Sequence, residues 1–266
     1  MNSKLVLSIA LLLNISLSHA CMNTYEQELR MGYIDIQHEL AQAKKNPPKT
    51  FEQLNDYGVV LIQAHRYQEA IEIFEQLEKQ RQNVAQTAAN LGTAYELAGQ
   101  ISKARYWIQQ GIKRNAHIHE GSEWIHLKIL DAQMKQNENP EWIKQNDVFG
   151  LNFGNGAAPK AKVKQIEFDG QRYNLNQIFE HSKIQMLQRL SLVDKDPITA
   201  QILFNMANIE VIQMGEEEDA AGVLYSTASH LGYHDPELLQ MRKDYISHSK
   251  WYAFKRFFAE IIHIFS

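Results

Sequence analysis

Cysteine is nearly absent from this sequence, which has one, Cys21, among 266 residues. A single cysteine excludes an intramolecular disulfide, so the fold must be stabilised by packing. It also excludes the paired-cysteine motifs of zinc and redox sites. The sequence also has no large excess of positive or negative charge, because 27 basic and 31 acidic residues leave a formal charge of −4. We therefore expect no nucleic-acid partner recruited by a basic field.

Catalytic and phosphate-binding motifs are missing as well. Gly150, Gly154 and Gly156 lack a preceding strand and a following Lys-Ser/Thr pair, so they do not form a phosphate loop. There is no Gly-x-Ser-x-Gly elbow. Carboxylates cluster only at 216–219, where negative charge suits the first turn of a helix. We predict that the chain is not an enzyme and holds no cofactor, and we keep a helical enzyme only as a third class.

The chain has 11 histidines, which raises the question of a metal site. They include two groups, one at 117, 119 and 126 and the other at 230 and 234. Neither group shows a His-Glu-x-x-His pattern or an acidic residue at a recognised ligand spacing. We interpret them as surface or loop histidines and predict no metal site. Glu123 and His126 stand three residues apart on one predicted helix, but that pair alone does not indicate catalysis.

The first twenty residues have the features of an export signal. Lys4 precedes the apolar run 5–17, and Ser18 and Ala20 place small residues before a cleavage point. The run is too short for a membrane span. We therefore predict a signal peptide at 1–20 and an exported protein, either periplasmic or membrane-anchored on the periplasmic side.

Cys21 then has two readings. It partly resembles the acylated cysteine of bacterial lipoproteins, although Ser18 stands where that box usually has leucine. Lipidation at Cys21 would tether the protein to a membrane. The alternative is ordinary cleavage with an incidental thiol.

What the sequence does contain is a repeat with a period of 34 residues. The equivalent pairs are Gly58 and Gly92, Leu61 and Tyr95, Ala70 and Ala104, and Phe74 and Ile108. Small residues let two helices approach closely, and bulky residues beside them fill the remaining space. This pattern predicts two helical hairpins packed through Gly58, Ala70, Phe74, Gly92, Tyr95 and Ala104.

The repeat resembles the tetratricopeptide repeat, of the kind found in uncharacterised exported bacterial proteins. Residues 51–118 resemble two repeats and 197–232 a third, divergent one. The resemblance implies a mainly α fold, an α-solenoid of antiparallel helical hairpins. It also implies a groove that binds a protein or peptide, lined by Asn55, Val59, Ile62, Ala89, Thr93, Glu96 and Trp124.

The remaining organisation follows from composition. Residues 21–145 are predicted to form an N-terminal helical cap and the repeat block, and 176–248 a C-terminal helical part with a degenerate repeat. Residues 146–175 between them read as a linker and a small β-hairpin near 163–175. Asp169-Gly170 suits the tight type I′ turn of such a hairpin.

The C-terminal segment 249–266 is aromatic and amphipathic. We expect a helix that is buried on the last repeat, lies in a membrane interface beside its basic residues, or docks another protein. Taken together, the sequence predicts a binding scaffold of the bacterial cell envelope. The alternative function is a membrane-surface protein that acts through this C-terminal helix.

Overall fold

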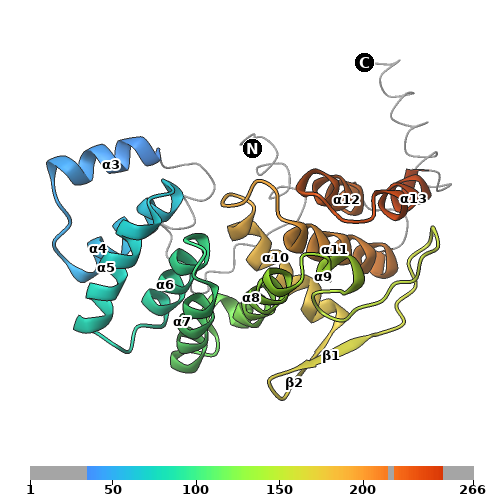
Figure 1. Ribbon diagram of the computed structural model, residues 1–266, viewed down its shortest axis with the longest axis horizontal. Coiled ribbons are helices and arrows are strands. Elements are labelled where there is room, and N and C mark those ends of the chain that lie inside the picture. Colours follow the sequence, from blue (N-terminus) through green and yellow to red (C-terminus); the bar gives the residue numbers. More distant parts are fainter. Residues whose placement is uncertain (1–34, 215–218, 248–266) are drawn as a thin grey trace, which may run out of the picture. The chain divides into compact units, whose positions relative to one another are not determined.

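The computed structural model describes residues 35–214 and 219–247. They form two compact units, and each is treated by itself. The first unit holds residues 35–139 and 184–193, and the second holds the other described residues. Eleven α-helices and one two-stranded antiparallel sheet make up the regular structure of the described residues (Figure 1). The prediction of a mainly helical chain with one small β-hairpin is therefore confirmed.

The first unit is a succession of helices that pack on their neighbours in sequence. The helices are α3 (Ile36–Lys45), α4 (Phe51–Gln63), α5 (Tyr67–Gln80), α6 (Ala85–Leu97), α7 (Ile101–Arg114), the 3-10 turn η1 (Ile118–Gly121) and α8 (Glu123–Glu138). Helix α4 begins with a capping box formed by Thr50 and Gln53. The Gln53 amide donates to the Thr50 hydroxyl at 3.1 Å, and the Thr50 amide donates to the Gln53 side chain at 3.2 Å.

The 34-residue period of the sequence is also the period of the helix boundaries. Helix α6 begins and ends 34 residues after α4, and α7 begins and ends 34 residues after α5. The turns between them are equivalent too. His65 and Gly99 both have positive φ, at 59° and 75°. Each is followed by a residue whose amide bonds back to a carbonyl five residues earlier, which closes the preceding helix.

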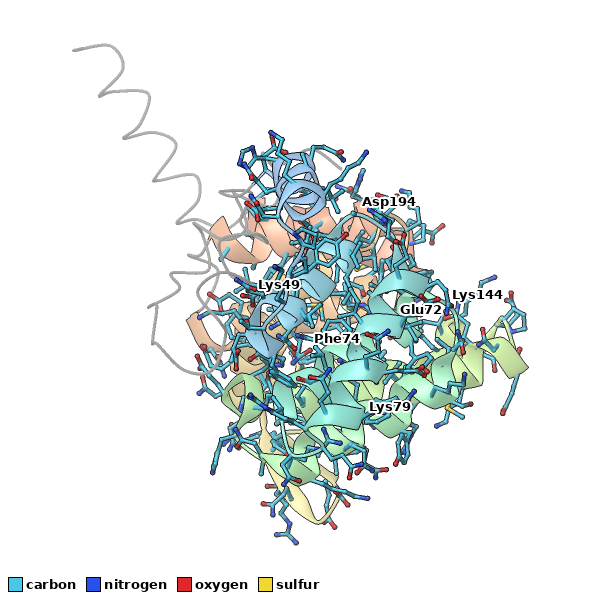
Figure 2. The ribbon with its side chains drawn as sticks, turned by 90° about the vertical axis from the view of Figure 1, so that its left-hand side faces the viewer. Lys49, Glu72, Phe74, Lys79, Lys144 and Asp194 are labelled. Carbon is cyan, nitrogen blue, oxygen red and sulfur yellow. The ribbon has the colours of Figure 1, made fainter. Side chains whose placement is uncertain are left out.

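The small repeat residues lie where paired helices are in contact. A Cβ added at Gly58 would lie 2.4 Å from the Phe74 ring, and one added at Gly92 would lie 2.6 Å from the Ile108 side chain. Ala70, Ala104 and Phe74 are fully buried, as is Ile108. Figure 2 labels Phe74 on α5 together with Glu72 and Lys79, which are exposed residues of the same helix. The Tyr95 hydroxyl donates to the Glu75 carboxylate, which ties α6 to α5.

The turn at His65 supplies a stability test. A non-glycine residue at positive φ carries strain of about 1 kcal/mol, whereas Gly99 adopts the same backbone conformation without that strain. We expect His65→Gly to raise the free energy of unfolding by about 0.5–1 kcal/mol, despite loss of the ring contact to Tyr67 at 2.6 Å. Urea denaturation measures this change. A destabilised variant would show that the ring contact outweighs the backbone strain.

The second unit is also mainly helical. Its elements are α9 (Trp142–Gln145), β1 (Gln165–Phe168), β2 (Gln171–Asn174), the first part of α10 (Leu175–Arg189), α11 (Pro197–Met214), α12 (Asp219–Leu231) and α13 (Pro236–Ser247). In the hairpin Ile166 pairs with Tyr173 and Phe168 with Gln171. Asp169 and Gly170 have φ of 50° and 74°, as a type I′ turn requires.

The segment predicted as a linker is a packed loop. Its apolar residues Val148, Phe149, Leu151 and Phe153 are at most 6% exposed. Two buried groups hold it. The Asp147 carboxylate accepts bonds from loop amides and from the α11 side chains of Gln201 and Asn205, while the Arg242 guanidinium of α13 donates to the carbonyls of Phe153 and Gly154. These bonds satisfy a backbone that forms no helix or sheet here.

Several predictions fall outside the described residues. They are the signal peptide 1–20, Cys21, the acidic residues at 216–218, the segment 249–266 and the part of the N-terminal cap helix before residue 35. Within residues 35–214 and 219–247, no helix is both long and apolar enough to span a bilayer.

Candidate functional site

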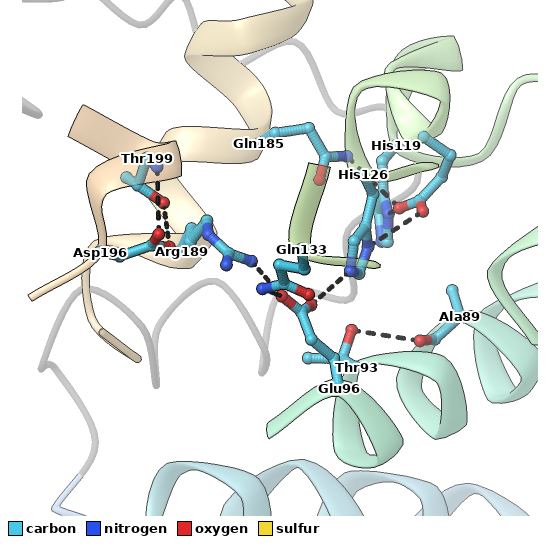
Figure 3. A network of polar contacts seen from close by, with 11 residues as sticks. Ala89, Thr93, Glu96, His119, His126, Gln133, Gln185, Arg189, Asp196 and Thr199 are labelled. Atoms are coloured by element: carbon cyan, nitrogen blue, oxygen red, sulfur yellow. Dashed lines mark hydrogen bonds and ion pairs between the residues drawn. The ribbon is translucent and has the colours of Figure 1, made fainter. Parts of the chain in front are cut away.

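A buried cluster of charged side chains is the most unusual feature of the first unit, and Glu96 of α6 stands at its centre (Figure 3). The Glu96 carboxylate contacts three side chains, two from α8 and one from segment 184–193. Arg189 Nη1 donates to Oε1 at 2.6 Å, and Gln133 Nε2 donates to the same oxygen at 2.7 Å. His126 Nε2 lies 2.7 Å from Oε2. Glu96, His126 and Arg189 are 6%, 6% and 8% exposed, so these charges have left water.

A second buried carboxylate belongs to the same cluster. Glu123 occupies the first position of α8 and contacts His119 Nδ1 through Oε1. Its Oε2 lies 3.5 Å from His126 Nδ1. The imidazole of His126 therefore has a carboxylate at each ring nitrogen, because Glu123 lies one helical turn before it and Glu96 faces it from α6.

The turn that holds His119 has an uncommon backbone. His119, Glu120 and Gly121 have φ of 46°, 57° and 75° in succession. The His119 carbonyl accepts bonds from both the amide and the hydroxyl of Ser122, at 3.0 and 2.6 Å. Non-glycine residues at positive φ cost free energy, and such residues concentrate at functional sites. Here the turn places His119 inside the unit, next to Glu123.

The buried charges shift one another's pKa values. Burial by itself would raise the pKa of both carboxyl groups. Arg189 and His126 outweigh that effect at Glu96, and the two histidines outweigh it at Glu123, so both pKa values fall well below the usual range. Burial would lower the pKa of His126, but the two carboxylates overcome it and raise the pKa to about 9.

These shifts limit the chemistry of the cluster. At neutral pH both carboxylates are ionised and His126 is protonated, so none of the three has a pKa suited to proton transfer. The cluster instead presents fixed, paired charges that position neighbouring segments. Among residues 35–214 and 219–247, no set of three or more His, Cys, Asp or Glu side chains is arranged to hold a metal ion.

A small hollow adjoins the cluster, with room for about one water molecule. One side is formed by α6 and α8, and the other by residues of segment 184–193. The lining residues are Thr93, Glu96, Leu97, His126, Ile129, Gln185, Gln188, Arg189 and Leu192. Segment 184–193 therefore lies against this face of α6 and α8 with little space left over.

The residues predicted to line a groove lie mostly in the interior. Asn55, Val59, Ile62, Ala89, Glu96 and Trp124 are 6%, 3%, 4%, 1%, 6% and 4% exposed. Thr93 is half-buried, and its hydroxyl donates to the Ala89 carbonyl at 3.2 Å. The Asn55 side chain accepts a bond from Thr87 of α6 at 3.2 Å. Of this set, Thr93 and Glu96 face segment 184–193 across the hollow.

The interpretation as surface or loop histidines is wrong for His126 of α8, whereas His119 lies in a turn but is buried. His119 and His126 are 3% and 6% exposed and are paired with carboxylates, whereas His117 and His230 are exposed. The sequence reasoning missed Arg189, Gln185 and Gln133. The available signal was the spacing of Glu123 and His126 on one helix, but the partners that bury this pair come from distant parts of the chain.

Comparison with known proteins does not assign this chain to a family. No protein-family model matches this chain, and no curated protein matches it.

The titration of the cluster predicts a pH dependence of stability. The pKa of His126 is about 9 in the folded protein and near 6.5 when unfolded. The contribution of His126 to the free energy of unfolding is therefore complete below pH 6.5 and is lost as pH rises through 9. Both carboxyl groups have lowered pKa values, so their contributions exist above about pH 4.5 and are lost on further acidification.

We therefore expect the free energy of unfolding to fall by about 1–3 kcal/mol between pH 6.5 and 9.5. Urea denaturation at a series of pH values measures the slope. The His126→Gln variant should lack it, whatever its own stability. Equal slopes for the two proteins would contradict the assignment to His126.

Proposed function

We propose that this protein is an exported binding scaffold of the bacterial envelope, built on helical repeats that resemble tetratricopeptide repeats. The observation that carries the proposal is the 34-residue recurrence of helix boundaries, turns and close helix contacts in α4 to α7. Repeated helical hairpins of this period stack so that their first helices share one face, and such faces usually hold another polypeptide.

The polar cluster supports binding more than catalysis. Its carboxylates and His126 are held in one charge state at neutral pH, and they bond to segments of the protein itself. Fixed charges of this kind give geometric specificity to a bound segment. The proposal of export rests on the signal-like sequence at 1–20. The proposal of membrane attachment rests on Cys21, which directly follows that sequence.

The proposal is tested by crosslinked capture from a bacterial envelope fraction, using the full-length protein. We expect the wild type to capture one protein reproducibly in near-stoichiometric amount. The Thr93→Arg variant should reduce this at least tenfold, because Thr93 lines the small hollow on the face of α6, where an arginine side chain leaves no room for a bound segment. The matched Lys79→Ser change, at an exposed position of α5, should leave capture unchanged.

Thermal melting of all three proteins checks that they remain folded. Capture of no protein by the folded wild type would contradict the proposed function. Equal loss with both variants would contradict the assignment of the binding face.

A further inference from the structure

Segment 184–193 packs on the earlier helices of the first unit. It consists of the end of α10 and the turn after it, and it is separated in sequence from the rest of this unit, which ends at residue 139. Arg189 reaches Glu96, which lies 93 residues earlier, and Gln185 donates to the Ser122 hydroxyl at 2.9 Å. The segment therefore packs on helices of this unit that lie much earlier in the sequence.

The seated segment combines buried apolar and polar side chains. Met186 and Leu190 are 0% and 1% exposed, and they stand four residues apart, on one face of a helix. Gln185 and Arg189 also stand four residues apart and are 5% and 8% exposed. The segment therefore presents two adjacent stripes, one apolar and one that donates hydrogen bonds.

The surface beneath it is complementary to the second stripe. Glu96 offers a carboxylate to the guanidinium, and the Ser122 hydroxyl accepts from the Gln185 amide. Removal of the segment would leave two carboxylates, Glu96 and Glu123, facing two histidines, because Arg189 would be gone. A different segment that covered Glu96 without bringing a cation would bury this carboxylate without a guanidinium partner, at a large desolvation penalty. The surface therefore discriminates strongly in favour of a segment that brings a cation to Glu96.

We infer that this surface, formed by Thr93, Glu96, Leu97, Ser122, His126 and Ile129, is a helix-binding face which the protein's own segment 184–193 fills. The partner that it fits is an amphipathic helix carrying Gln-x-x-x-Arg-Leu, with an apolar residue directly after the glutamine. This inference rests on the proposed function and names the class of partner. Because the protein's own segment is tethered at an effective concentration on the order of millimolar, a partner binds only when it displaces that segment.

A labelled peptide tests the inference on the full-length protein. The peptide has the sequence of residues 180–194, and binding is followed by fluorescence anisotropy. We expect weak binding to the wild type. Binding should be at least tenfold tighter to the Gln185→Ala/Arg189→Ala double variant, whose own segment is weakened. The same peptide with Arg189→Met should bind the double variant at least tenfold more weakly than the native peptide.

Circular dichroism establishes whether the double variant is folded. With a folded variant, absence of peptide binding, or equal binding of the native and Arg189→Met peptides, would overturn the inference. If the variant does not fold, the wild type is used instead, with hydrogen exchange as the readout. Excess native peptide should then speed amide exchange within residues 184–193 at least fivefold, and the Arg189→Met peptide should not. Unchanged exchange would overturn the inference.

The two proposals fail in different ways. Peptide binding without capture of any envelope protein would leave the helix-binding face in place and remove the proposed external partner. Capture of an envelope protein that native peptide does not compete away would keep the scaffold function and place its partner elsewhere.

Discussion

Replacement of Glu96 with alanine should lower the free energy of unfolding by about 3–5 kcal/mol. The variant leaves the Arg189 guanidinium and the protonated His126 imidazole buried without the carboxylate that both contact. Loss of one partner from a buried ion pair is costly because the remaining charges lose that carboxylate and stay away from water. Urea denaturation near pH 6.5 is the appropriate measurement, because His126 is then charged in the folded protein.

A matched control comes from an exposed ion pair. Glu52 lies 3.2 Å from Arg81, and the two side chains are 70% and 59% exposed. Glu52→Ala should change stability little, because water and salt screen such pairs. A similar small effect at Glu96 would show that this carboxylate is not buried between two cations in solution.

Alanine at Gly58 or Gly92 should destabilise the protein by about 1–3 kcal/mol, although alanine is the better helix former. A Cβ at Gly58 meets three carbons of the buried Phe74 ring at 2.4–2.9 Å. A Cβ at Gly92 lies 2.6 Å from the Ile108 side chain and 3.0 Å from its backbone nitrogen. Neither neighbour is the free end of an exposed side chain, so the helices must move apart.

Gly222 of α12 provides the control for this prediction. It is also helical, but an added Cβ there has no heavy atom within 4 Å. Gly222→Ala should therefore raise the free energy of unfolding by up to about 1 kcal/mol. We therefore expect the free energy of unfolding to fall for the Gly58 and Gly92 variants and to rise for Gly222→Ala. A gain at Gly58 or Gly92 would contradict close contact of the paired helices.

Local features of the fold could be predicted from the sequence because they depend on neighbouring residues. The Thr50 capping box, the Asp169-Gly170 turn and the start of α11 at Pro197 each need only a few adjacent positions. The contact of Gly58 with Phe74 also follows from a repeated spacing. In each case the signal lies within one turn or one helical hairpin.

The candidate site could not be predicted in the same way. Glu96 and Arg189 lie far apart in the sequence, and a single charged residue on a helix ordinarily indicates a solvated surface. Glu96 was expected to line a groove, and it faces segment 184–193, but no pattern in the sequence predicts the arginine opposite it. His119 enters the interior through a turn in which His119, Glu120 and Gly121 have positive φ, and only Gly121 is a sequence signal for that backbone.

The most direct test of the account is a double-mutant cycle between Glu96 and Arg189. The wild type, Glu96→Gln, Arg189→Met and the double variant are compared by urea denaturation at pH 6.5. We expect the two changes to be strongly non-additive, with a coupling energy of about 1.5–3 kcal/mol. A coupling energy below about 0.3 kcal/mol, as for residues that do not interact, would contradict the claim that this ion pair holds segment 184–193 on the earlier helices of the first unit.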